Sequence, residues 1–242
     1  MDYLYDGTFE GLMTAVYYHY KKDKASGIYE LDNYQQSIVF QSGIVKTDIS
    51  KARTVIDAIN KLISREAYIN IYYCYLSNAL NKENIILEFL IFAFKYGKNT
   101  MNFYTHKKVL PINEIYKRVA REEHRILGIL RFSDIGGILY AKYSPDNDIS
   151  ILLADHFADR YKYEKFIIYD EKRKKAVIYS DNNWEIKENI NIDNVEFSAN
   201  EQKIQNLWKQ YFTDLAIKER KNINLQFQFV PARYRKNMNE FK

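Results

Sequence analysis

The chain has 242 residues, of which 47% are hydrophobic and 28% are charged, and its formal net charge is +5. This composition is typical of a soluble globular protein and excludes a disordered or fibrous chain. The single cysteine, Cys74, excludes a disulfide framework, a cysteine-ligated iron–sulfur cluster and a cysteine-based zinc site built from this chain alone.

The four histidines show no metal-ligand spacing, and we predict neither a metal nor a cofactor. The segment MDYLYDGTFEG lacks the basic start and apolar core of a signal peptide. The most apolar run, residues 85–94, is too short to span a bilayer and contains Glu88. We therefore expect a cytoplasmic protein with no membrane partner.

The charges are unevenly distributed along the chain. Residues 1–45 contain three Lys and six Asp or Glu, a local net charge of −3. Residues 201–242 contain nine Lys or Arg and four Asp or Glu, a local net charge of +5. A basic end suits a nucleic-acid or acidic-protein partner, although it also occurs in chains that have neither.

The first half of the chain is predicted to be helical. A short strand at 3–6 precedes a helix that begins at Phe9 and is capped by Asp6 or Thr8. Helices are predicted at 51–64 and 66–95, with a break near Asn81, before a loop at 100–111. Pro111 is expected to open the next helix.

The second half is predicted to contain β-hairpins and helices in the order ββαββα. A hairpin starts at residue 126 and turns near Asp134, and a helix covers 149–161. A second hairpin covers 165–181, a further strand follows at 184–188, and a helix runs from Ala199 to Lys221. The periodic apolar residues of that last helix predict that Trp208 is a core residue.

The fold class predicted from these elements is α+β. The N-terminal half is helical, and an antiparallel sheet of hairpins packs with helices in the C-terminal half. We expect a single compact domain over 1–242, with a possible helical subdomain at 1–110 and an α+β subdomain at 111–242.

A charged stretch, REEHRILGILRF at 121–132, ends the helix that Pro111 opens. On a helical wheel Glu123 falls within the apolar arc of that helix, and a buried carboxylate needs a partner. Arg131 and Arg160 are the candidate partners. Glu123 is then either a buried ion pair that fixes helix to sheet or a site carboxylate with a shifted pKa.

The three arginines on the opposite side of this helix have two interpretations. Arg118, Arg121 and Arg125 recur at intervals of three and four residues and form a basic stripe. Such a stripe is either a solvated face or a surface that contacts phosphates.

Two further residues are candidates for chemistry. His156 and Arg160 lie four apart on the edge of a predicted helix, where His156 either transfers protons or only hydrogen-bonds at a core margin. Asp6 lies in DGTFEG at a strand–turn–helix junction, whose backbone amides suit an anion, although no P-loop is present.

Gly11 inside this helix costs about 1 kcal/mol relative to alanine, which predicts that another group approaches the helix closely there. No arrangement specifies a reaction, and the catalytic candidates remain Glu123, His156 and Asp6.

The C-terminal motif interleaves cations with an aromatic residue. Arg233, Tyr234, Arg235 and Lys236 follow the alternating segment LQFQFVP, and Arg220 and Lys221 precede it. Cations with an aromatic ring suit a single strand or an extruded nucleotide, where stacking contributes about 1–3 kcal/mol per base. The alternative is a tail that packs its apolar residues against the sheet.

Several segments together resemble a bacterial family, domain-of-unknown-function family 4130, described as a probable DNA metabolism protein. They are YDGTFEGLMTAVY at 5–17, EEHRILGILRF at 122–132, ADHFADRY at 154–161, YDEKRKKAVIY at 169–179, WKQYFTDLAIKERKN at 208–222 and VPARYRKNMNEF at 230–241. The resemblance implies a protein encoded beside a radical S-adenosylmethionine (SAM) enzyme that modifies or repairs DNA. One cysteine cannot hold the cluster of that enzyme, so the resemblance implies its companion.

Three functions follow as hypotheses. The favoured one is an accessory component of DNA metabolism that binds DNA, the radical SAM enzyme, or both. The second is an enzyme acting on a nucleotide or modified base through a pocket of Glu123, His156 and Arg131. The third is a protein–protein scaffold with an exposed apolar patch. The candidate nucleic-acid contacts are Arg118, Arg121, Arg125, Arg131, Arg160, Arg220, Arg233, Tyr234, Arg235 and Lys236.

Overall fold

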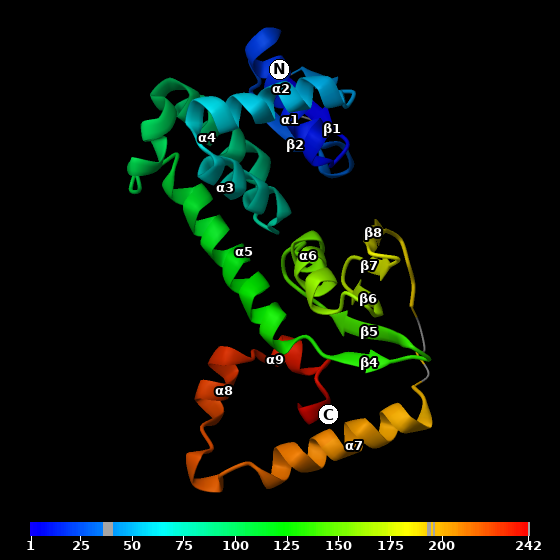
Figure 1. Ribbon diagram of the computed structural model, residues 1–242. Coiled ribbons are helices and arrows are strands. Elements are labelled where there is room, and N and C mark those ends of the chain that lie inside the picture. The colour runs from blue at the N-terminus through cyan, green and yellow to red at the C-terminus, as the bar shows by residue number, and fades with distance from the viewer. Residues whose placement is uncertain (36–40, 193–194, 196, 242) are drawn as a thin grey trace. The chain divides into compact units, whose positions relative to one another are not determined.

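The computed structural model describes residues 1–35, 41–192, 195 and 197–241. These residues form two compact units, Met1–Ala120 and Arg121–Lys242, which are described separately below. The predicted α+β class is confirmed, because helices dominate the first unit and a five-stranded sheet lies in the second (Figure 1). The division into one domain with two subdomains stays a prediction.

The N-terminal unit contains a three-stranded parallel sheet with the order β2-β1-β3. The central strand β1 (Asp2–Tyr5) is buried at all four positions, as expected for a parallel strand covered on both faces. Its predicted position at 3–6 is therefore confirmed to within one residue. The flanking strands β2 (Gly27–Glu30) and β3 (Ser42–Ile44) were not predicted, because strands of three or four residues carry too little periodic signal.

The helices of this unit agree with the predicted pattern. Thr8 caps α1 by accepting a hydrogen bond from the Gly11 amide, and Asn81 adopts a positive φ of 59° at the predicted break between α3 and α4. The described helices that begin in this unit are α1 (Phe9–Lys21), η1 (Leu31–Asn33), α2 (Ile49–Ala58), η2 (Ile59–Ile63), α3 (Arg65–Leu76), α4 (Lys82–Tyr96), η3 (Gly97–Asn102) and α5 (Leu110–Ile129). Of the helices in the described ranges, none is both long and apolar enough to cross a membrane.

The C-terminal unit is built on a five-stranded sheet with the order β4-β5-β6-β7-β8. Both predicted hairpins and the additional strand are present. The sheet is mixed rather than wholly antiparallel, because α6 (Ser150–Arg160) connects β5 to β6 and these two strands pair in parallel. The strands are β4 (Phe132–Asp134), β5 (Ile138–Tyr143), β6 (Lys165–Asp170), β7 (Lys175–Ser180) and β8 (Asn183–Lys187).

The first predicted hairpin begins later than expected, because α5 continues to Ile129. Ile126 is buried on this helix and extends the buried stripe that includes Ile115 and Val119. Helical packing of that stripe therefore prevails over the β-like composition of the segment, and the prediction of strand from residue 126 is wrong.

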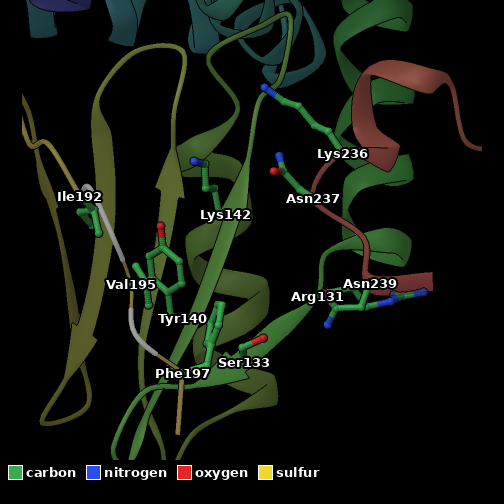
Figure 2. A pocket seen from close by; sticks show the side chains of 10 residues that line it. All are labelled: Arg131, Ser133, Tyr140, Lys142, Ile192, Val195, Phe197, Lys236, Asn237 and Asn239. Carbon is green, nitrogen blue, oxygen red and sulfur yellow. The ribbon is translucent and has the colours of Figure 1, made fainter. Parts of the chain in front are cut away.

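The two faces of the C-terminal sheet differ. One face packs on α6, where the ring of Phe157 lies edge-on to Phe132 at a centroid distance of 5.1 Å. Successive strand residues alternate between faces, so Ser133, Tyr140 and Lys142 belong to the opposite face. This second face borders a cavity of about 300 Å³ that Ser133, Tyr140 and Lys142 help to line (Figure 2).

The last helices depart most from the prediction. Helix α7 (Ala199–Asp214) ends before Lys221, and its apolar residues are exposed rather than buried. Trp208, predicted as a core residue, is 40% exposed. The residues LQFQF of the segment LQFQFVP, predicted as alternating, instead belong to helix α8 (Ile223–Phe229), whose N-terminus is capped by the side chain of Asn222. The remaining short helices are η4 (Lys218–Arg220), α9 (Ala232–Arg235) and η5 (Asn239–Phe241).

Candidate functional site

In the C-terminal motif Tyr234 is buried, whereas Arg233 and Lys236 are exposed and paired with carboxylates. Tyr234 is only 3% exposed, and its hydroxyl donates a hydrogen bond to Glu122. Burial, followed by this hydrogen bond, raises the pKa of Tyr234 to about 12, so the hydroxyl keeps its proton at neutral pH. Arg233 pairs with Asp146 at 2.9 Å, and Lys236 pairs with Glu171 at 2.7 Å. A buried Tyr234 offers no free ring face for base stacking.

The buried carboxylate of α5 is Glu122 and not Glu123. Glu122 is 4% exposed, whereas Glu123 is half-buried. The Glu122 carboxylate accepts hydrogen bonds from the backbone amides of Asp146 and Asn147 at 2.8 and 2.9 Å, and from the Asn147 side chain at 2.6 Å. Neutral donors therefore stabilise the Glu122 carboxylate, whereas the sequence predicted a buried Glu123 with an arginine partner.

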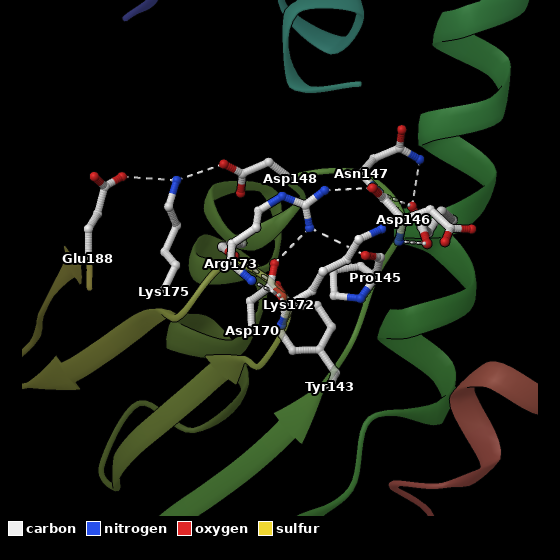
Figure 3. A network of polar contacts seen from close by, with 12 residues as sticks. Tyr143, Pro145, Asp146, Asn147, Asp148, Asp170, Lys172, Arg173, Lys175 and Glu188 are labelled. Carbon is white, nitrogen blue, oxygen red and sulfur yellow. Dashed lines mark hydrogen bonds and ion pairs between the residues drawn. The ribbon is translucent and has the colours of Figure 1, made fainter. Parts of the chain in front are cut away.

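A polar network fixes the loop that Glu122 contacts (Figure 3). Arg173 donates to the Asp170 carboxylate and to the backbone carbonyls of Pro145 and Asp146. Asp170 is fully buried, and burial raises its pKa despite the opposing effect of the nearby Arg173 guanidinium. The network holds the β6–β7 turn, the loop at 144–148 and α5 together, and so provides a fixed base for the C-terminal segment.

The other catalytic candidates are placed as follows. His156 is exposed on α6, and its ring lies edge-on to Phe157. Asp6 belongs to the N-terminal unit, where its carboxylate accepts hydrogen bonds from the Thr8 amide, the Thr8 hydroxyl and the Thr47 hydroxyl. Partial burial opposes ionisation of Asp6, but these hydrogen bonds outweigh it and lower the pKa of the carboxyl.

The predicted close approach at Gly11 is explained by Asp6. A Cβ atom at Gly11 would clash with the Asp6 carboxylate oxygen and lie 2.8 Å from the Thr47 hydroxyl. Glycine at this position therefore leaves room for the Asp6 carboxylate to brace the turn before α1.

The remaining predicted arginines lie on different elements. Arg118 and Arg121 are exposed on α5, and Arg125 on the same helix is half-buried. Arg160 is exposed beside the Tyr161 ring, with 5.7 Å from guanidinium to ring centroid. Arg131 donates to Glu240 at 2.8 Å.

A groove of about 850 Å³ lies between the end of α7, α8 and the last residues of the chain. Three cations line it: Arg220, Lys221 and Arg235. Of the described residues that line it, none carries a carboxylate. The aromatic and aliphatic residues of its wall include Tyr211, Phe212, Leu215, Ile217, Ile223, Phe227 and Phe241.

Contacts with the rest of the unit hold this groove in place. Glu201 of α7 is buried and accepts a hydrogen bond from the Asp134 amide at 3.1 Å. At the other end, the Arg235 guanidinium lies over the Phe227 and Phe241 rings at 3.9 and 4.5 Å, and its Nε donates to the Val230 carbonyl. The Phe227 and Phe241 rings therefore position the Arg235 guanidinium, which lines the groove.

The groove contains both kinds of group that bind an unpaired nucleotide. Tyr211 is 57% exposed, Phe227 is 44% exposed, and the exposed Trp208 stacks on Tyr211 with 5.7 Å between ring centroids. Aromatic rings stack on bases, and cations neutralise the backbone phosphates. The sequence interpretation identified Arg220 and Arg235 but missed Tyr211, because its helical spacing is also typical of a core face. It missed Phe227 because that residue lies in a segment predicted as alternating.

Within the described ranges, no group of three or more His, Cys, Asp or Glu side chains is arranged to hold a metal ion.

Comparison with known families gives one result. The model of a domain of unknown function, DUF4130, matches residues 80–240, which is more than half of the chain. The chain belongs to this family. The DUF4130 match contains every groove residue except Phe241. No curated protein matches the chain.

Proposed function

We propose that this DUF4130 protein is a cytoplasmic accessory component of DNA metabolism that binds single-stranded DNA, or a nucleotide turned out of a duplex, in the groove between α7 and α8. The observation that carries the proposal is the composition of that groove, in which three cations and several exposed aromatic rings line one volume of about 850 Å³. The basic C-terminal end of the sequence supports the same assignment.

Aromatic side chains favour an unpaired strand over a duplex. Base faces are stacked and hidden in a duplex, whereas they are open to Tyr211 and Phe227 in a single strand. Each base–aromatic stack contributes about 1–3 kcal/mol with little sequence preference. The protein is therefore expected to bind single strands of different sequence with similar affinity.

Salt dependence tests the electrostatic part of the proposal. Arg220, Lys221 and Arg235 would neutralise three phosphates, which predicts a slope of about −2 for log affinity against log salt on a single strand. The affinity then falls roughly 20-fold between about 50 and 200 mM salt. Fluorescence anisotropy with matched single- and double-stranded oligonucleotides measures both slope and preference. Equal affinity for both forms, or no binding in low salt, would contradict the proposal.

A second candidate function is docking of a protein partner on the same helices. Exposed aliphatic side chains, which do not stack on bases, also lie on α7 and α8 or directly beside them: Ile204, Leu207, Leu215, Ile223 and Leu225 are each at least 48% exposed. Contiguous exposed apolar surface is typical of interaction sites. The partner implied by the family resemblance is the radical SAM enzyme. A complex of this kind would withstand high salt, which DNA binding in the groove would not.

A further inference from the structure

The chain from the end of α4 to the start of α5 concentrates positive charge (Figure 1). Residues 89–113 contain four lysines and no Asp or Glu, a local net charge of +4. The lysines are Lys95, Lys98, Lys107 and Lys108. Within the part of the chain that the structure describes, none of the four forms an ion pair. Their charge is therefore available to an external anion.

Exposed aromatic rings are interleaved with these lysines. Tyr104 is 62% exposed, Tyr96 is 41% exposed and Phe103 is 39% exposed. The Lys95 ammonium lies 5.5 Å from the centroid of the Tyr96 ring. Among the described residues 97–108, the rings of Phe103 and Tyr104 are the only large apolar side chains that are exposed, because Met101 is buried. The apolar part of this surface is therefore aromatic and not aliphatic.

Short turns around a buried ring fold these residues into one surface, called the turn surface below and comprising residues 95–108. The Thr100 hydroxyl donates to the Gly97 carbonyl at 2.7 Å, and the amides of Phe103 and His106 donate to the carbonyls three residues before them at 3.1 and 3.0 Å. The buried Phe92 ring stacks on His106 at a centroid distance of 4.1 Å and meets Phe103 edge-on at 5.6 Å. The lysines and exposed rings are therefore carried by an ordered backbone.

Nucleic acids, anionic membranes and acidic proteins all bind basic surfaces, and the side chains between the lysines favour the first. Rings stack on bases, while lysine, asparagine, threonine and tyrosine side chains contact phosphates and sugars. Asn99, Asn102 and Thr105 are all exposed on the turn surface. A membrane-binding segment adds leucine to its aromatic residues, and a protein-docking surface is a contiguous apolar patch. Described residues 97–108 expose no large aliphatic side chain.

We propose that the turn surface is a second contact for single-stranded DNA, in addition to the groove between α7 and α8. The lysines contact phosphates, and the Tyr104 ring stacks on an unpaired base. The choice of DNA rests on the proposed function, but the surface itself does not, because it belongs to the N-terminal unit and shares no residue with the groove. The turn surface binds more weakly than the groove, since lysine contacts a phosphate as a flexible point charge, whereas arginine binds it with two fixed hydrogen bonds.

A tryptophan reporter in the full chain tests the turn surface directly. Tyr104→Trp combined with Trp184→Phe and Trp208→Phe leaves one tryptophan, at an exposed position that tolerates the larger ring. A short single-stranded oligonucleotide should quench its emission saturably, and four phosphate contacts predict a slope of about −3 for log affinity against log salt. Absence of quenching in low salt at millimolar oligonucleotide would overturn the proposal, even where the Trp184→Phe variant reports binding in the groove through Trp208.

The same reporter variant distinguishes the other classes of partner. A matched duplex should quench the emission much less than the single strand, because its base faces are hidden. Poly-glutamate and vesicles of anionic phospholipid, which present negative charge without bases, should leave the emission unchanged. Quenching by the duplex equal to that by the strand, or saturable quenching by either of the other two probes, would overturn the assignment to a single strand.

Two lysine pairs, each replaced in the reporter variant, separate a local contact from a general effect of net charge. Lys98→Gln combined with Lys107→Gln removes two of the four cations, so the slope should fall from about −3 to about −1.4. Lys21→Gln combined with Lys22→Gln is the charge-matched control, because both lysines are exposed in the same unit and lie outside the turn surface. The control should keep the slope at about −3. An unchanged slope in the first pair, or an equal fall in the control, would overturn the proposal.

Discussion

Glu122→Ala is expected to lower the free energy of unfolding of the C-terminal unit by about 3–4 kcal/mol. The substitution leaves the amides of Asp146 and Asn147, the Asn147 side chain and the Tyr234 hydroxyl without their acceptor. Urea denaturation followed by tryptophan fluorescence measures this loss, because both tryptophans of the chain lie in this unit.

Glu123→Ala is the matched control for this prediction. It removes the same carboxylate one residue further along the same helix, where the side chain is half-buried. Its effect should stay within about 1 kcal/mol. An equal or larger loss of stability in Glu123→Ala would contradict the assignment of Glu122 as the buried anchor.

Two groove variants are expected to weaken DNA binding in different ways. Tyr211→Ala combined with Phe227→Ala removes two stacking rings, and should lower single-strand affinity at least about 30-fold with the salt slope unchanged. Arg220→Gln combined with Lys221→Gln removes two phosphate contacts, and should reduce the slope from about −2 to about −0.7. Anisotropy titrations at three salt concentrations distinguish the two effects.

The control for these variants is another exposed pair of a cation and an aromatic residue. The Lys162 ammonium lies 6.0 Å from the centroid of the Tyr163 ring, and Tyr163 is 92% exposed. Neither residue lines the groove. Lys162→Gln combined with Tyr163→Ala should change single-strand affinity by no more than about twofold. Loss of a single binding contact of about 1.4 kcal/mol would lower the affinity tenfold. An equal loss in this control would mean that binding depends on general surface composition and not on the groove.

The positions of most helices and strands could be predicted from the sequence. Which of two adjacent residues on a helix is buried could not. Hydrophobic spacing identified α5 and both hairpins, but a wheel at 100° per residue placed Glu123 on the apolar side. The helix buries Ile112, Ile115, Val119, Glu122 and Ile126, a sequence of three- and four-residue steps in which Glu122 replaces an apolar residue. Only the donors at Asp146 and Asn147, distant in sequence, determine which carboxylate is buried.

The aromatic residues near the C-terminus show a second limit of sequence patterns. Periodic apolar residues on α7 are typical of a core face, yet Trp208 and Tyr211 are exposed, because burial depends on which surface a helix packs against. Tyr234, predicted as a stacking ring, is buried against Glu122. The cations of the site were recognisable from local charge, while its rings required the fold.

The emission of Trp208 during titration with a single-stranded oligonucleotide is the most direct test of the proposed function. Trp184→Phe leaves Trp208 as the single tryptophan, stacked on Tyr211 at the groove. Binding in the groove predicts saturable quenching of this emission that is reversed by salt. Binding detected by anisotropy without any change in Trp208 emission would contradict the placement of DNA in the groove, and absence of binding would contradict the function itself.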